Sequence, residues 1–258
     1  MFIYENNKSM SKEIRASITE TFGFEPICIN SALVSAQNRQ RLYWVGVRQA
    51  DGTYRKASIE QPADRGILLK DVLDSAVAVQ IGEVSGGKAP TLKAQYAKNG
   101  TANFITNGGF QAAAAADPIR VGTMPRERDG VQTDGQAFRI YDPAGKSATL
   151  KAESGGAGGK TGLYATQETP AKQQRVYEVK DGMIEVNGRR YPIRLHDGKY
   201  IIRKLTVTEC MRLQTVPEWF DFSCVSNTQA YKMLGNGWTC EVIAHLIRGA
   251  IKSSIFGV

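Results

Sequence analysis

The sequence predicts an α/β protein whose chain also carries a small, irregular, β-rich domain. Three observations support this fold class. The first 60 residues alternate short apolar strands with one amphipathic helix. Fifteen of the 26 glycines then fall between Gly82 and Gly162, in a stretch rich in Thr, Ser, Lys and Ala. The last 58 residues return to helical periodicity. A chain of 258 residues can hold one large domain or two smaller ones.

The N-terminal region is predicted to form part of a sheet. Strands are expected at 2–4, 24–30 and 41–48, which are rich in β-branched and aromatic residues. Between the first two strands, a helix that begins near Ser11 and stops at Gly23 would place three apolar side chains on one face, namely Ile14, Ile18 and Phe22. Three strands and one helix cannot cover both faces of a sheet, so this region is predicted to be a fragment of a larger fold.

The middle of the chain, about 61–200, contains an internal repeat. Gly87-Lys88-Ala89-Pro90-Thr91-Leu92-Lys93-Ala94 recurs as Gly145-Lys146-Ser147-Ala148-Thr149-Leu150-Lys151-Ala152. Two copies are too few for a solenoid, which needs at least ~3, so we expect two similar turns on one domain. The glycine cluster at 154–160 is either a plain surface loop, which its glycine content favours, or a loop whose backbone approaches a ligand.

The C-terminal region is predicted to form three helices. Thr206 with Glu209 makes a capping box for the first, and Ser226 with Gln229 makes one for the second. Gly235 is expected to end the second helix. The tripeptide 235–237 either presents backbone N–H groups and an amide to a ligand or is a simple helix break. The third helix carries an apolar stripe of Trp238, Val242, Ile243, Leu246, Ile247, Ala250 and Ile251.

Composition indicates a soluble globular protein, with 42% apolar and 22% charged residues. No apolar run approaches the ~20 residues that span a membrane, and the N-terminus lacks signal-peptide features, so we expect a cytoplasmic location. The net charge of +8 is spread along the chain and fits a polyanionic partner. The four cysteines lie far apart with no CxxC pair, which favours buried free thiols over a zinc site.

The most informative segment is Gln37-Asn38-Arg39-Gln40-Arg41, directly before the third predicted strand. Alternate side chains of an extended segment share a face, so Gln37 and both arginines would point the same way. This predicts a cationic tip that could hold an anionic or carbonyl-rich ligand. The alternative is a surface pair of arginines that binds phosphate or a neighbouring acid, and Arg39 fits that alternative better than Arg41.

Four segments, in order, resemble the C-terminal part of a DNA (cytosine-5) methyltransferase. Residues 4–7, Tyr-Glu-Asn-Asn, match a Glu-Asn-Val motif with Asn7 in place of Val, and residues 37–41 match Gln-x-Arg-x-Arg at every defined position. The other matches are Arg203-Lys204-Leu205-Thr206 with Glu209, Arg212-Leu213-Gln214 and Pro217, and Tyr231-Lys232-Met233-Leu234-Gly235-Asn236-Gly237.

The resemblance implies a Rossmann-like methyltransferase domain, represented here by its C-terminal part at 1–60 and by helices at 217–258. The insert at 61–216 would be the target-recognition domain that binds double-stranded DNA. The reaction implied is methyl transfer from S-adenosylmethionine to C5 of a cytosine flipped out of the duplex.

The resemblance also assigns roles to individual residues. Glu5 would face N3 of the cytosine and Arg41 its O2, with Gln37 and Arg39 as supports. Asn236, flanked by Gly235 and Gly237, would border the cofactor. In the insert the family carries a Thr-Leu dipeptide, for which there are two candidates, Thr91-Leu92 and Thr149-Leu150. Lys160, Arg126 and Arg128 are candidates for phosphate or groove contacts with DNA, although an ordinary solvated charge is the favoured interpretation of each.

Two features of the family are not matched in this chain: a glycine-rich cofactor loop and a Pro-Cys loop that carries the nucleophile. No cysteine directly follows a proline. The resemblance therefore implies activity only with a second chain that supplies the N-terminal half, against which the last helix would pack. The alternatives are an inactive truncated fragment and a non-catalytic DNA-binding module. The target sequence and the biological role, whether restriction-modification, phage self-protection or another, stay open.

Overall fold

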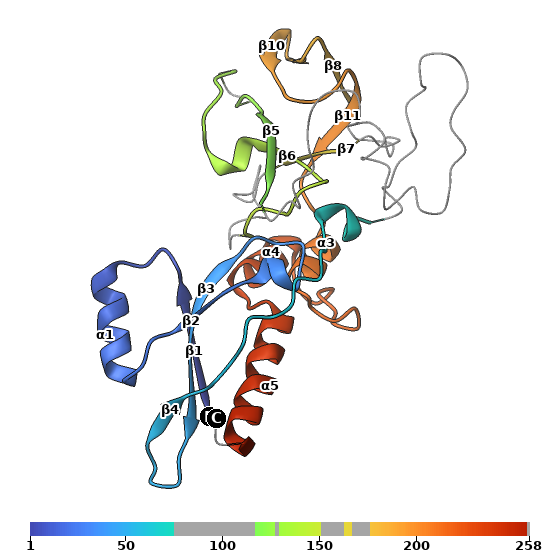
Figure 1. Cartoon of the computed structure of the whole chain (residues 1–258). Helices are drawn as coiled ribbons and strands as arrows, with labels where there is room; N and C mark the ends of the chain where they lie inside the picture. Colours follow the sequence, from blue (N-terminus) through green and yellow to red (C-terminus); the bar gives the residue numbers. More distant parts are fainter. Residues whose placement is uncertain (75–116, 127–128, 151–162, 167–175, 257–258) are drawn as a thin grey trace.

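The structure is a computed structural model that describes residues 1–74, 117–126, 129–150, 163–166 and 176–256. Two β-sheets lie on either side of a junction at which helices α3 (Val207–Leu213) and α4 (Asn227–Asn236) are found (Figure 1). The first sheet carries the N-terminal segments and the last helix. The second sheet is built from residues 119–203. The chain is therefore a mixed α/β protein with a β-rich insert, as predicted.

The first sheet is organised around β3 (Gln40–Arg48), which is antiparallel to every neighbour. On one side it pairs with β1 (Phe2–Asn7), and on the other with β2 (Ile27–Asn30) and β4 (Tyr54–Lys56). All three predicted strands are found, although the second, expected at 24–30, begins only at Ile27. β1 continues through three polar residues beyond the predicted end, because Glu5, Asn6 and Asn7 pair with the first residues of β3.

Helix α1 (Lys12–Phe22) lies over one face of this sheet. At its N-cap, Ser11 Oγ accepts a hydrogen bond from the amide of Ile14. Gly23 ends the helix with a φ of 77°, a conformation that favours glycine. Phe22 packs on the ring of Phe2 with a centroid separation of 4.8 Å. The predicted apolar face is used mainly at its C-terminal end, since Ile14 is 53% exposed.

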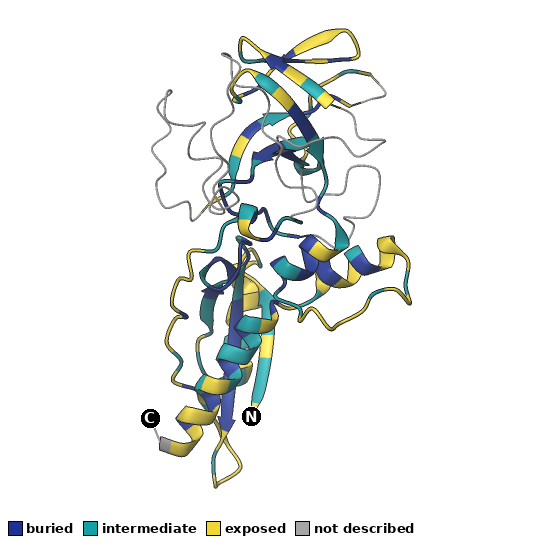
Figure 2. Ribbon diagram, turned by 90° about the vertical axis from the view of Figure 1, so that its right-hand side faces the viewer, coloured by how far each residue is buried: buried dark blue, intermediate teal, exposed yellow. Residues whose placement is uncertain are grey.

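The opposite face of the sheet is covered by α5 (Cys240–Phe256), as Figures 1 and 2 show. Val242, Leu246 and Ala250 are buried against a cluster that includes Tyr43 and Val45 of β3. The prediction that the stripe on the last helix packs against an absent half is thus wrong for these residues, which bury their side chains within the chain itself. Two other members of the predicted stripe, Trp238 and Ile251, remain exposed.

The second sheet has the strand order β10-β9-β8-β11-β7-β6-β5. All neighbours are antiparallel except β6 and β7, which are parallel. The strands are β5 (Ile119–Thr123), β6 (Arg139–Asp142), β7 (Leu163–Thr166), β8 (Val176–Lys180), β9 (Met183–Val186), β10 (Arg189–Pro192) and β11 (Gly198–Arg203). Positive φ angles at Asp181-Gly182 and Asn187-Gly188 form the tight turns that join β8, β9 and β10.

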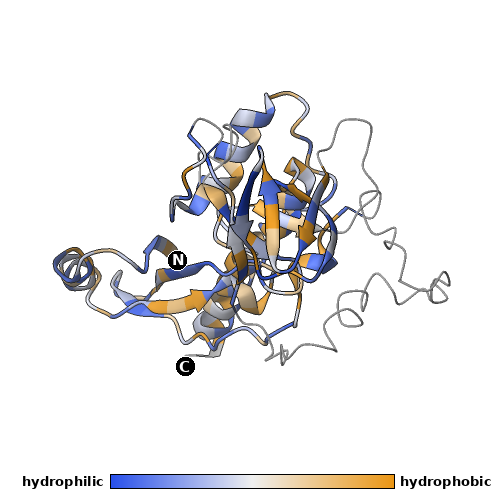
Figure 3. Cartoon of the chain, turned by 90° about the horizontal axis from the view of Figure 1, so that it is seen from above, coloured by the Kyte–Doolittle hydropathy of each residue, from blue (hydrophilic) through white to orange (hydrophobic). Residues whose placement is uncertain are grey.

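Three core clusters stabilise the molecule. One lies between the first sheet and α5, one within the second sheet, and one at the junction. The junction cluster combines Ala36, Leu150, Tyr164, Leu213 and Leu234, which come from five separate segments. Seen from above, hydrophobic residues are frequent in the strands and helices near the centre of the molecule (Figure 3). The junction is consequently a packed interior rather than a flexible link.

Short 3₁₀ turns at Ser31–Leu33 (η1), Leu69–Asp71 (η2) and Gln136–Phe138 (η4) complete the described elements. Of the four cysteines, only Cys210 is buried, while Cys28 is half-buried and Cys224 and Cys240 are exposed, so the expectation of buried thiols is wrong for these three. Among the described residues, no helix has the length and apolarity needed to cross a bilayer.

Candidate functional site

Glu5 and Arg41 meet at one end of the first sheet. In the β1–β3 ladder Glu5 lies opposite Tyr43 and Asn7 lies opposite Arg41, so the side chains of Glu5, Tyr43 and Arg41 share one face. Arg41 Nε is 2.9 Å from Glu5 Oε1, and the two side chains are 15% and 19% exposed. Arg41 Nη1 also donates to the Gln40 carbonyl. The structure thus brings these two residues together, as predicted, and the pair is accessible from solvent. Their catalytic roles stay a prediction.

Charges around this pair perturb two neighbours. Burial, and after it the Glu5 carboxylate, raise the pKa of the Tyr43 phenol, so that this side chain stays neutral beside the pair. Burial and the nearby Arg41 lower the pKa of Arg39 to about 10, while Glu5 acts in the opposite direction. Arg39 is therefore still a cation at neutral pH, and Glu5, Arg39 and Arg41 form one electrostatic group.

Arg39 is not the surface residue that one alternative predicted, because it is only 5% exposed. Its Nη1 donates to the carbonyl of Leu150 at 3.1 Å. Its Nη2 donates to the carbonyls of Gly235 at 3.3 Å and Gly237 at 3.0 Å. The side chain thus contacts Leu150 of the insert and the end of α4, and its partners are backbone carbonyls rather than a phosphate-like group.

Gln37 is completely buried, and within the part of the chain that the structure describes its Nε2 and Oε1 have no hydrogen-bond partner. Its backbone forms an isolated parallel bridge with Ser147, and its backbone amide donates a hydrogen bond to Ser35 Oγ. Among the described residues, Gln37 makes no hydrogen bond to Glu5 or Arg41. The supporting role that the resemblance implied for Gln37 stays a prediction.

The tripeptide 235–237 differs from the prediction. Gly235 and Asn236 are the last two residues of α4, and Gly237 is the cap, with its amide bonded to the Met233 carbonyl. The helix therefore does not stop at Gly235, and Asn236 ends a helix rather than opening one. Gly235 is buried, while Asn236 is exposed. A Cβ on Gly237 would come within 3.0 Å of the Met233 carbonyl, which explains a glycine there.

The second copy of the internal repeat forms the seam between the insert and the first sheet. Ser147 exchanges backbone hydrogen bonds with Ala36 and Asn38, and Thr149 Oγ1 donates to the Asn38 carbonyl at 2.5 Å. Leu150 is buried in the junction cluster. We name residues 145–150 the docking segment. Thr149 and Leu150, predicted to contact DNA, thus contact the chain itself here, and their DNA role stays a prediction.

Lys146 anchors the docking segment in an unusual way. Its side chain is 2% exposed, and Nζ donates to the carbonyls of Ala32 at 2.9 Å, Ser35 at 3.1 Å and Ile67. Burial lowers the pKa of this ammonium, with Asp64 and Asp71 acting in the opposite direction from a distance. No sequence signal distinguishes this lysine from the others, because only the fold brings the three carbonyls together.

Asn30 is a second residue that the sequence analysis missed. Its Oδ1 accepts the amides of Ala32 at 3.1 Å and Arg39 at 2.9 Å, and its Nδ2 donates to Asn38. An Asn at the end of a predicted strand is a recognisable signal for such a turn. Gln214 and Thr239 are also buried, and Thr239 links Gln214 Oε1 to Ser31 Oγ. These side chains fix the backbone around the site.

The other predicted DNA contacts lie elsewhere. Thr91, Leu92, Arg128 and Lys160 are outside the described residues, as are the first repeat copy and the glycine cluster. Arg126 is 2.6 Å from Asp129 and is solvent-exposed, so its charge is already paired with a neighbour.

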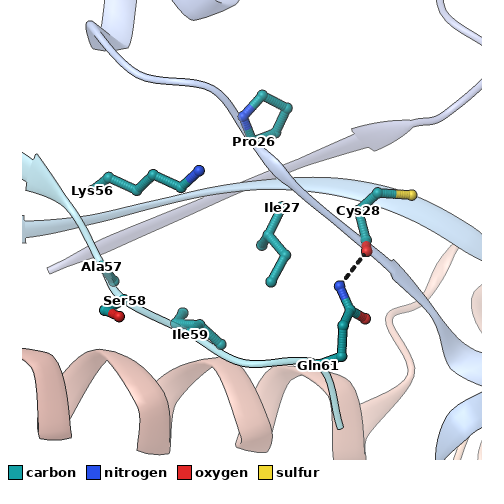
Figure 4. Close-up of a pocket in the computed structure, with 8 residues that line it drawn as sticks. All are labelled: Pro26, Ile27, Cys28, Lys56, Ala57, Ser58, Ile59 and Gln61. Atoms are coloured by element: carbon teal, nitrogen blue, oxygen red, sulfur yellow. Dashed lines mark hydrogen bonds between the residues drawn. The ribbon is translucent and has the colours of Figure 1, made fainter.

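A groove of about 630 Å³ lies at the outer side of β2, across β3 from Glu5 (Figure 4). It is lined by Pro26, Ile27, Cys28, Lys56, Ala57, Ser58, Ile59 and Gln61, and Gln61 Nε2 donates to the Cys28 carbonyl at 2.9 Å. None of the residues predicted to be functional lines this groove. In the described segments no cluster of His, Cys, Asp and Glu could hold a metal ion.

A model of the C-5 cytosine-specific DNA methylase family matches residues 5–252. The match begins at Glu5 and includes every segment of the Glu5–Arg41 site. The chain belongs to this family.

Individual relatives are more distant. Over 50 residues the chain is 40% identical to the type II methyltransferase M.AluI of Cellulosimicrobium cellulans, which is 19% of this chain and 10% of that protein. It is also similar to the methyltransferase EhMeth of Entamoeba histolytica, with a TM-score of 0.49 and 15% identity, and to the Dnmt2 methyltransferase of S. pombe, with 0.43 and 14%. In both cases 97% of this chain is covered, but it spans only 62% and 65% of those chains.

Proposed function

We propose that this chain carries the base-binding part of a DNA (cytosine-5) methyltransferase, which transfers a methyl group from S-adenosylmethionine to C5 of a cytosine flipped out of duplex DNA. The observation that supports this most is the Glu5–Arg41 ion pair at 2.9 Å, partly exposed at the end of the first sheet. Family membership from residue 5 to 252 supports the reaction class.

Cytosine C5 is a poor nucleophile until a thiolate adds to C6, and this addition places negative charge on the ring at N3 and O2. A carboxyl group that faces N3 can hold a proton there, which is general acid catalysis and contributes about 10²–10⁴-fold. Glu5 takes this role. Arg41 faces O2 with its guanidinium while its Nε holds Glu5 in place. The neutral Tyr43 beside them adds no competing charge.

S-adenosylmethionine, when bound, supplies the methyl group as an electrophile. Of the residues 235–237, only Asn236 has a side chain that is free to contact such a ligand. Asn236 is exposed and can offer its amide, whereas the Gly235 and Gly237 carbonyls already accept Arg39. We therefore assign Asn236 to the cofactor edge, with the two glycines shaping its backbone.

We also propose that a second chain supplies the nucleophile and the rest of the cofactor site. No proline directly precedes any of the four cysteines, so a Pro-Cys loop is not among these 258 residues. The insert then serves as the target-recognition domain, whose basic side chains contact phosphates.

The test is transfer of a tritiated methyl group to duplex DNA, by the chain alone and mixed with a polypeptide that carries a Pro-Cys loop and a cofactor loop. We expect transfer only in the mixture, and a loss on the order of 10²-fold for Glu5→Gln and for Arg41→Ala. The matched control is the exposed Arg15–Glu25 pair at 2.7 Å, for which Arg15→Ala and Glu25→Gln should keep full activity.

Three outcomes would contradict parts of this proposal. Unchanged activity of the Glu5 and Arg41 variants would refute the site. Methylation by the chain alone would refute the need for a second chain. Duplex binding without transfer in any mixture would favour a DNA-binding module over an enzyme.

A further inference from the structure

Arg39 joins three segments that are far apart in the sequence. It precedes β3, and its guanidinium reaches Leu150, which lies 111 residues away, and Gly235 and Gly237, which lie 196 and 198 residues away. The first acceptor belongs to the docking segment of the insert. The other two belong to the C-terminal end of α4. One side chain therefore links the insert, the first sheet and the turn that carries Asn236.

The buried charge of Arg39 restricts the positions of the carbonyl groups that surround it. Among the described residues Arg39 forms no ion pair, so its buried charge is held by carbonyl groups. Two of them lie at the negative end of the α4 dipole, where a cation is favoured. A buried cation that loses its acceptors is strongly destabilised. The three carbonyls are consequently held in one arrangement around the planar guanidinium.

The backbone of Arg39 is fixed as well. Its amide donates to Asn30 Oδ1 at 2.9 Å, and its carbonyl accepts the amide of Ser31 at 2.9 Å. Both contacts tie it to the end of β2. Arg41 follows two residues later in the same strand entry and pairs with Glu5. The Arg41 guanidinium is thus carried by a backbone that is fixed two residues earlier, at Arg39. The side chain of Arg39 is in turn bound to the insert and to the end of α4.

We propose that Arg39 is a positioning residue rather than a catalytic one: it couples the docking of the insert to the Glu5–Arg41 pair and to the turn at 235–237. The contacts of Arg39 lie within the chain and do not depend on the proposed function. Only the consequence of the coupling for DNA and cofactor binding rests on that function. In a methyltransferase, binding of the insert to DNA would then also fix the positions of the residues that contact the flipped base and the cofactor.

The experiment measures hydrogen exchange of single amides in the complete chain, with its partner polypeptide where one is needed for folding. Four amides report on the two sides of Arg39: Asn38 and Ser147 at the docking segment, and Gly237 and Cys240 at the turn, each bonded to a backbone carbonyl. In Arg39→Met we expect all four to exchange about tenfold faster or more, while amides of the β9–β10 hairpin keep their rates. Arg15→Met, which removes an exposed arginine, is the matched control.

A second variant separates coupling from a general loss of stability. Thr149→Val removes the hydroxyl that donates to the Asn38 carbonyl and should loosen the docking segment. With Arg39 present, we expect this change also to speed exchange at Gly237 and Cys240. In the Arg39→Met background it should add nothing at the turn. If Arg39→Met does not fold, Arg39→Lys keeps the charge without the planar fork and replaces it.

Two results would overturn the inference. One is unchanged exchange at the turn in the Arg39 variants, and the other is an equal effect of Thr149→Val on the turn with and without Arg39. An assembly that transfers no methyl group would refute the proposed function, yet the exchange rates would still decide the role of Arg39.

Discussion

The replacement of Glu209 by Gln should destabilise the junction strongly. Glu209 is completely buried and accepts four hydrogen bonds: two from Arg203 at 2.9 Å, one from the Thr206 amide at 2.7 Å and one from the Asp74 amide at 3.1 Å. Its own amide donates to Thr206 Oγ1, which completes the capping box of α3. One carboxylate therefore fixes the end of β11, the start of α3 and residue 74.

The magnitude follows from the chemistry of the substitution. A carboxylate accepts at both oxygens, whereas the amide of Gln has one acceptor oxygen and an NH₂ group that would face donors. The change also removes the negative charge that faces the Arg203 guanidinium in the interior, where that side chain is 12% exposed. Breaking a buried ion pair from one side costs about 3–5 kcal/mol. This is a large part of the free energy of unfolding of a typical domain, which is ~5–15 kcal/mol.

Urea denaturation of the folded chain measures the effect as a lower midpoint with an unchanged slope. The control is Glu25→Gln, which removes a carboxylate from the exposed pair with Arg15, a change worth at most about 1 kcal/mol. The reasoning fails if Glu209→Gln unfolds within about 1 kcal/mol of the wild type, or if both variants lose the same free energy.

Three further predictions concern single buried groups. Gln37→Met should leave the free energy of unfolding unchanged or raise it by about 1–3 kcal/mol, because no described group pairs with the amide; a clear loss in urea denaturation would reveal a hidden partner. Lys146→Met should lower it by at least about 1–3 kcal/mol, because three buried carbonyls lose their donor; an unshifted midpoint contradicts this. Burial raises the pKa of the Cys210 thiol, so the folded state keeps a proton that the unfolded state releases above about pH 8.5. Stability should then fall with rising pH by up to about 1.4 kcal/mol per unit, and a pH series on Cys210→Ala should lack this part of the slope.

Several local features could be predicted from the sequence because they depend on neighbouring residues. The Ser11 and Thr206 caps and the Gly23 stop are local hydrogen-bonding and backbone effects, and each is found where the pattern indicated. The three strands of the first sheet follow from short apolar runs. The Glu5–Arg41 pair was predicted from motif order, and the antiparallel register of β1 and β3 then brings the two side chains to one face.

Other features could not be read from local patterns. Gly235 reads as a stop, yet α4 continues to Asn236. At this end of the helix the carbonyls of Leu234, Gly235 and Gly237 accept hydrogen bonds from the distant side chains of Gln214 and Arg39. The stripe on α5 reads as a surface for an absent half, but its residues Val242, Leu246 and Ala250 pack in the cluster that includes β3. In both cases the partners are at least 20 residues away along the chain.

The order of the elements and the caps of the helices follow from the sequence alone. These depend on side-chain periodicity and on short-range hydrogen bonds, which are present in any stretch of about ten residues. Only the tertiary structure decided that Arg39 and Lys146 are buried and bound to carbonyls. A charge is buried only where the fold gathers enough acceptors from distant segments to replace water, and that gathering is not encoded in any one segment.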